Sequence, residues 1–339
     1  MNLPLLLVIR TLLILFGSFL LSMAFAPMLL RFLRERKFGK TIRDAGTAPI
    51  MSSLHAGKAG TPTMGGLVVW MTVTTLMLVL SFTPWNFLSR GQTLLPLGAF
   101  VAAAIVGLVD DYWNIRRIGP RGGGLRMRHR LVSYSFIALV VAWWFYSKLG
   151  WDSLHVPFYG TLTLGWWYIP VFVFVIIATS FSVNETDGLD GLAGGPLMAA
   201  FTAYGVIAFA QGKMDLAMFA AAIVGALMAF LWYNVPPASF FMGDTGAMSL
   251  GTALGVLAML TNQALLLPII GLPFVIESLS VIIQIGSKKL RKKKVFLSAP
   301  IHHHLEASGW TEPQIVLRTW IVSLFSAGVG VVLALVDRV

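Results

Sequence analysis

The sequence predicts an all-helical protein that crosses a membrane about ten times. Hydrophobic residues make up 57% of the 339 residues and charged residues only 12%, whereas soluble domains are about 25% charged. The mean hydropathy is +0.80, and apolar runs long enough to cross a bilayer core, roughly 20 residues, recur along the chain. We therefore expect residues 1–339 to form a single integral membrane domain.

The ten expected spans are joined by loops that are short after the even-numbered spans, whereas the polar motifs lie in the loops after the odd-numbered spans. They cover residues 3–30, 63–82, 94–110, 131–149, 166–183, 191–210, 216–233, 247–263, 265–285 and 314–336. The first run is too long for the core of a signal peptide and is expected to be retained. Pro268, Gly271 and Pro273 should kink or break the ninth span. The break can open a cavity, or it can be an ordinary proline kink in which Glu277 bonds a neighbouring helix.

Basic residues set the orientation of these spans. Of the 25 Lys and Arg residues, 19 lie in residues 31–61, 111–130 and 286–313, which follow the first, third and ninth spans. Loops rich in Lys and Arg stay in the cytoplasm, so both termini should lie outside. The net charge of +11 is thus explained by topology and contact with the lipid bilayer, and no nucleic-acid partner is expected. The absence of cysteine excludes disulfides and thiolate metal sites.

Acidic side chains interrupt the apolar pattern at three places on the cytoplasmic side. They are Asp110 and Asp111 after the third span, Glu185, Asp187 and Asp190 after the fifth, and Asp244 at the start of the eighth. A carboxylate at membrane depth costs a few kcal/mol, so ionisable residues there are functional candidates. Oxygen ligands from separate loops suit Mg²⁺, which also takes substrate phosphates.

Each acidic site also has a structural interpretation, which the sequence leaves open. The alternatives are ion pairs of Asp110 and Asp111 with Arg116 or Arg117, an N-cap at Asp187 with Asp190 three residues later, and an N-cap at Asp244.

Cationic and hydroxyl side chains lie on the same predicted face. Lys58 and Thr63 precede the second span, and the consecutive His302, His303 and His304 lie in the last basic loop. Three consecutive histidines on a helix point about 100° apart, so they cannot all bind one metal. Imidazole can hydrogen-bond a phosphate or a nucleotide, and we expect one or two of these histidines to face a ligand. The alternatives are a solvated histidine cluster and, for Lys58, an ordinary loop.

Carboxylates for a metal and cations for phosphates together suit phosphoryl transfer to a lipid acceptor.

These motifs resemble the polyprenyl-phosphate N-acetylhexosamine-1-phosphate transferases over nearly the whole chain. The resemblance rests on Thr61–Gly66, Asp110–Tyr112, Thr186–Ala193, Phe241–Asp244 and Ala299–His304. The triple histidine after Ala-Pro-Ile is typical of the muramoyl-pentapeptide branch.

The resemblance implies a substrate pair and a cofactor. It implies Mg²⁺-dependent transfer of phospho-MurNAc-pentapeptide from UDP-MurNAc-pentapeptide to undecaprenyl phosphate, which yields lipid I and UMP. It also implies a bacterial cytoplasmic membrane location, an active site facing the cytoplasm, and commonly a homodimer.

The resemblance further implies roles for individual residues. Asp244 resembles the Mg²⁺ ligand, and Asp110 and Asp111 resemble the pair that orients or deprotonates the lipid phosphate. Asn184, Asp187, Asn234 and His303 would line the nucleotide-sugar site, with His302 and His304 beside it; Lys58, Thr63, Gly188, Leu189, Asp190 and Phe241 would form the uridine pocket, with Gln284 nearby. Glu185 and Arg130 depart from the family, which usually has leucine and lysine there.

Other functions remain open at this stage. The nearest is a sibling transferase that uses UDP-GlcNAc or another UDP-sugar. A cation-coupled transporter also has buried acids and a broken span, although its acids are expected at the midplane. A purely structural scaffold leaves the converging acids unexplained.

Overall fold

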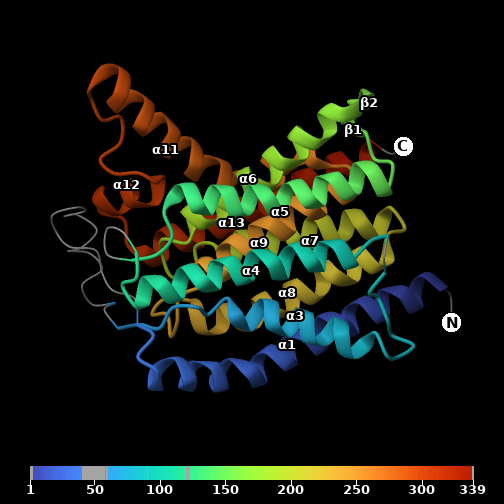
Figure 1. Ribbon diagram of the computed structural model, residues 1–339, viewed down its shortest axis with the longest axis horizontal. Coiled ribbons are helices and arrows are strands. Elements are labelled where there is room, and N and C mark those ends of the chain that lie inside the picture. The colour runs from blue at the N-terminus through green and yellow to red at the C-terminus, as the bar shows by residue number, and fades with distance from the viewer. Residues whose placement is uncertain (1–2, 40–57, 59, 90, 120–122, 338–339) are drawn as a thin grey trace.

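The computed structural model describes residues 3–39, 58, 60–89, 91–119 and 123–337, and each of the ten expected spans forms a helix in it (Figure 1). The helices are α1 (Leu3–Glu35), α3 (Leu67–Leu80), α4 (Leu94–Ile115), α5 (Met127–Lys148), α6 (Tyr168–Thr186), α7 (Gly194–Ala210), α8 (Met214–Asn234), α9 (Gly243–Leu260), α11 (Leu272–Arg291) and α13 (Glu312–Val336). Short elements complete the described chain: η3 (Gly165–Trp167), η4 (Ala264–Leu266), α10 (Leu267–Ile270), α12 (Ile301–Ala307), β1 (Ser153–Val156) and β2 (Gly160–Thr163).

The lengths and apolar composition of the helices are those of a membrane-spanning bundle. Among the described residues, six helices are long and apolar enough to cross one, and the bent α10–α11 segment makes a seventh; α3 and α7 are apolar but shorter. The polytopic helical fold class is therefore confirmed. Within the bundle α8 is central, since 83% of its apolar window is buried, whereas α1 and α13 are 17% and 28% buried in theirs and present apolar side chains outwards.

The predicted break in the ninth span is confirmed. The segments Ala264–Ile270 and Leu272–Arg291 meet at 85°, and α11 leans away from the bundle (Figure 1). Gly271 lies at the break and Pro273 is in the first turn of α11, where a proline is tolerated because its missing N–H has no helical partner. Glu277 is buried and accepts hydrogen bonds from the His302 backbone and ring, so the hydrogen bond expected for an ordinary kink is also present, but to the short helix α12.

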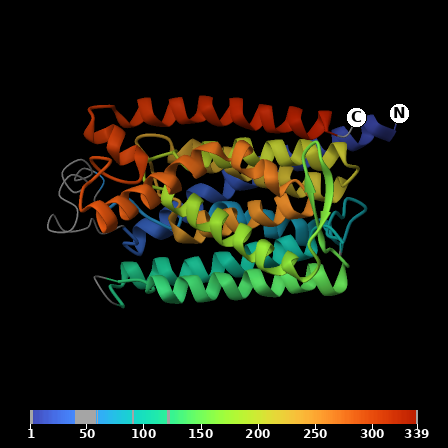
Figure 2. The same cartoon turned by 90° about the horizontal axis from the view of Figure 1, so that it is seen from above.

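The start of α1 and the end of α13 lie at the end of the bundle opposite α12 (Figures 1 and 2). Strands β1 and β2, which the sequence analysis did not foresee, form an antiparallel hairpin there. Asp337, just after α13, binds the hairpin through the His155 ring and the Phe158 amide. These two bonds hold the pKa of the Asp337 carboxyl below its ordinary value.

This hairpin contact makes one contribution to stability depend on pH. A carboxyl whose pKa is lowered by folding stabilises the fold above its unfolded pKa of about 4, and the contribution disappears as the pH falls through the lower folded value. We expect Asp337→Asn to lower the melting temperature at pH 7, and the difference from wild type to shrink between about pH 5 and pH 2. Melting curves over that range test this; a difference that does not change with pH contradicts it.

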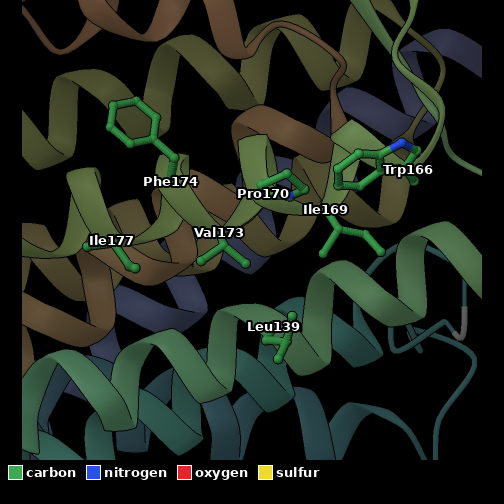
Figure 3. A pocket seen from close by; sticks show the side chains of 7 residues that line it. All are labelled: Leu139, Trp166, Ile169, Pro170, Val173, Phe174 and Ile177. Carbon is green, nitrogen blue, oxygen red and sulfur yellow. The ribbon is translucent and has the colours of Figure 1, made fainter.

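An apolar pocket of about 570 Å³ opens between α5 and α6 (Figure 3). Leu139 of α5 faces Ile169 and Val173 of α6, and Trp166 lies at one end. No acidic or basic side chain lines it, so it suits hydrocarbon and not a phosphorylated donor.

Candidate active site

Asp111 joins the cytoplasmic end of α4 to the start of α9. It is buried, and its carboxylate accepts hydrogen bonds from the backbone N–H groups of Asp244 and Thr245, each at 3.0 Å. The first N–H groups of a helix have no partner within the helix, and the helix dipole favours negative charge there. Asp111 therefore caps α9 from another helix, a role that its position in the sequence does not reveal.

Gly107 permits this approach. A Cβ at that position would lie 2.4 Å from the carbonyl oxygen of Asp244, closer than real Cβ contacts allow, so α4 and α9 cross with backbone against backbone. Asp110 and Asp111 follow Gly107 by one turn. The predicted third span ends too early, because α4 continues to Ile115 and both acids lie inside the helix.

Arg130 of α5 links Asp110 to Asp244. One guanidinium nitrogen, Nη2, contacts Asp110 and lies 2.6 Å from Asp244 Oδ2, while the Asn184 side-chain amide donates to Asp244 Oδ1 at 2.6 Å. Asp110 also accepts from the Leu125 amide at 2.5 Å. Four helices thus contribute to one charged cluster, made by Asp110, Asp111, Arg130, Asn184 and Asp244, which we call the aspartate cluster.

The aspartate cluster decides between the interpretations that the sequence left open. Asp110 pairs with Arg130, and Arg116 lies over the Tyr112 ring, so the expected alternative of pairing in the next turn is wrong for Asp110. Met242 is the N-cap of α9, so the capping interpretation of Asp244 is wrong.

The geometry predicts how Arg130 substitutions behave. Because one nitrogen makes both ion pairs, a lysine ammonium can replace it, and we expect Arg130→Lys to keep turnover within about tenfold. Arg130→Met removes the cation that pairs with the buried Asp110 carboxylate and with Asp244, a change that costs several kcal/mol, and should lower turnover at least a hundredfold. Initial rates measure both. Arg128→Met, an exposed arginine of the same helix, is the control; equal rates for the Lys and Met variants contradict the prediction.

The connection between α6 and α7 leads from the aspartate cluster to the histidines. Asp187 is the C-cap of α6 and α7 begins at Gly194, so the N-cap interpretation of Asp187 is wrong. A Cβ at Gly188 would lie 2.2 Å from His302 Nε2, so only glycine lets this imidazole pack against the backbone. His302 Nδ1 lies 2.9 Å from Glu277, and its buried Nε2 has no hydrogen-bond partner within the described residues.

The same connection reaches Lys58 at its other end. The Lys58 ammonium lies 2.7 Å from Asp190 Oδ1 and 2.5 Å from Glu312 Oε1, and Asp190 Oδ2 accepts from the Ala238 amide. Lys58 is therefore not an ordinary loop residue, because it makes two ion pairs. Residues 184–190 contact all three parts of the site: the aspartate cluster, His302 and Lys58.

Several other residues that were predicted to bind substrate make hydrogen bonds or apolar contacts within the protein itself. Asn234 bonds the Gly191 amide and the Phe240 carbonyl. Gln284 bonds Val295 and Phe296, and Leu189 is buried in a cluster with Ile315 and Val316.

The remaining predicted residues lie at the edges of the same region. Thr63 is buried, and the Phe241 backbone pairs with Pro62 and Gly65. His303 is buried and lies 2.7 Å from Glu306, and His304 Nδ1 accepts from the Leu297 amide. Because His302 and His303 are buried, a fully solvated histidine cluster is wrong.

Sequence reasoning missed two members of the site. Arg130 was noted only as a departure from the family, because a cation in a basic loop looks like a topology signal. Glu312 stands in the first turn of α13 behind a Thr311–Gln314 capping box, where an acidic residue is expected for the helix dipole alone. Neither carries a sequence signal that separates it from these common roles.

The aspartate cluster fits a metal that is completed by substrate. Within the described residues, no group of three or more His, Asp and Glu side chains is arranged as a complete metal site. Mg²⁺ generally takes only one or two carboxylates, with water and substrate phosphates as the other ligands. Asp244, whose side chain is 19% exposed beside Asp110 and Arg130, suits the protein carboxylate of such a site.

The fold, the aspartate cluster and a match of residues 93–262 to the glycosyl transferase family 4 model define a membrane-embedded glycosyl transferase of that family. Residues 58–68 match signature 1 of phospho-N-acetylmuramoyl-pentapeptide-transferase. The enzyme of that name from Chloroflexus aurantiacus is 40% identical over 96% of this chain and 90% of its own length. Its counterpart from Bacillus anthracis is 42% identical over 93% and 94%. The chain belongs to the phospho-N-acetylmuramoyl-pentapeptide-transferase family.

Proposed function

We propose that this protein transfers phospho-MurNAc-pentapeptide from UDP-MurNAc-pentapeptide to undecaprenyl phosphate and releases UMP. The observation that carries the proposal is the aspartate cluster at the cytoplasmic end of the bundle, joined by residues 184–190 to Lys58 and His302. Family membership supports this donor. Buried apolar helices beside a charged centre suit a reaction between a lipid and a soluble nucleotide.

Asp244 would hold Mg²⁺, which when bound neutralises charge on the donor pyrophosphate. Phosphoryl transfer needs mainly positioning and charge neutralisation. Asp110 and Asp111 orient the lipid phosphate or accept its proton, and the phosphate oxygen attacks the β-phosphorus in line with the departing UMP. A two-step route through an aspartyl phosphosugar is the alternative; trapping that species on Asp110 or Asp111 would overturn the direct attack.

The donor is proposed to lie along residues 184–190. Asn184, Asp187, Asn234 and His303 line the sugar-phosphate part, and Lys58, Gly188, Asp190 and Phe241 line the uridine part. His302 supports this placement, because its buried Nε2 faces Gly188 and can bond a donor group there. A homodimer is proposed as well, and mass measurement in detergent tests it.

The deciding experiment compares donors. Purified protein in detergent with Mg²⁺ and undecaprenyl phosphate should release UMP from UDP-MurNAc-pentapeptide, and release should stop when either the lipid or the metal is withheld. Release from UDP-GlcNAc alone moves the protein to the sibling activity. No release from either donor by folded protein refutes the transferase, and substrate flux in proteoliposomes then tests the transporter.

A further inference from the structure

Glu312 joins two residues of the donor site that come from distant parts of the chain. Its Oε1 accepts from the Lys58 ammonium at 2.5 Å and from the Asp190 backbone N–H at 2.7 Å. Lys58 separately contacts the Asp190 carboxylate at 2.7 Å. Three elements therefore meet at one carboxylate oxygen: the segment before α3, the connection between α6 and α7, and the first turn of α13.

The charges in this group are not those of a simple structural ion pair. One ammonium faces two carboxylates, and only 17% of the Glu312 side chain and 4% of the Asp190 side chain are exposed. A single carboxylate suffices to neutralise Lys58. Burying the second carboxylate costs solvation free energy. It fixes the direction of the Lys58 side chain, which otherwise carries a point charge on a flexible four-carbon stem.

Other contacts already hold α13 against this connection. The Trp320 indole donates to the Gly191 carbonyl at 3.0 Å, and Leu189 and Leu192 pack against Ile315 and Val316. Helix α13 therefore does not need Glu312 to stay in place, so loss of its charge should release Lys58 and not the helix.

We propose that Glu312 is a positioning residue of the donor site, which holds Lys58 and the Asp190 backbone in the arrangement that binds the uridine nucleotide. The inference rests on the proposed function, because it takes Lys58 and Asp190 as donor-binding residues. Glu312 acts on donor affinity and not on the chemical step, since the aspartate cluster is built from other residues.

The test separates donor binding from turnover in the full-length protein. Glu312→Gln keeps the shape but loses the charge that strengthens two hydrogen bonds, and should raise the KM for the donor about tenfold. We expect kcat and the KM for undecaprenyl phosphate to stay within twofold. Glu312→Asp keeps the charge and should recover part of the donor affinity.

Trp320→Phe is the matched control, because it removes another hydrogen bond between α13 and the α6–α7 connection without removing a charge. It should lower the melting temperature and leave the donor KM unchanged. An equal rise in donor KM for Trp320→Phe overturns the proposal, as does an unchanged donor KM in Glu312→Gln. Calorimetric titration with UDP, without the lipid, should show the same tenfold weakening. Failure of the proposed function is distinct, because it appears as a wild-type protein that releases no UMP.

Discussion

Asp244→Ala is expected to lower UMP release about 100- to 1,000-fold while the protein still folds. Asp244 is the carboxylate proposed to hold Mg²⁺, and loss of one preorganised electrostatic partner of a transition state typically costs 100- to 1,000-fold. Its loss also frees the Asn184 amide, which donates to Asp244 Oδ1. Arg130 keeps its ion pair with Asp110, so the substitution leaves no unpaired buried cation and the bundle should persist.

The control is another acid in the first turn of a membrane helix. Asp215 lies in the first turn of α8, and that helix starts at the end of the bundle opposite the aspartate cluster. Asp215→Ala should keep turnover within twofold, and both variants should melt within a few degrees of wild type. Turnover of Asp244→Ala within tenfold of wild type contradicts the assignment of Asp244 as the metal ligand.

The helices of this fold were predictable because each expresses a local property of the chain. A run of about 20 apolar residues is helical in a bilayer whatever surrounds it, since every backbone polar group must be satisfied within the segment. Pro273 and Gly271 mark the break between α10 and α11 for an equally local reason. The β1–β2 hairpin was not predicted, because it depends on Asp337 and Asn262, which are distant in sequence.

The acidic residues of the site were predictable from the sequence, but the residues that they contact were not. Asp110, Asp111 and Asp244 stand out because charge is rare in apolar sequence. What each binds is decided by helix packing: Asp111 caps a helix more than 100 residues away, and Arg130 reaches two aspartates on two other helices. Asn234 and Gln284 show the converse, since their predicted substrate roles compete with hydrogen bonds inside the protein.

Gly107 should tolerate no side chain, because the aspartate cluster depends on its lack of one. In Gly107→Ala the new Cβ would lie 2.4 Å from the Asp244 carbonyl oxygen and 2.7 Å from the Thr245 Cα. Both are backbone atoms that cannot rotate away, so α4 and α9 must separate. Overpacking of this kind costs about 1–3 kcal/mol, and a displacement of about 1 Å at a reacting centre lowers rates about a hundredfold.

The expected result for Gly107→Ala is therefore a hundredfold loss of turnover with a lower melting temperature. Gly98→Ala, in the same helix, is the matched control, because nothing lies within 4 Å of its added Cβ, and alanine favours a helix by about 1 kcal/mol over glycine. It should keep full activity and melt no earlier than wild type. Both variants add the same methyl group to α4, so a difference between them measures the α4–α9 contact alone. Full activity in Gly107→Ala would mean that the aspartate cluster does not require backbone contact between these helices.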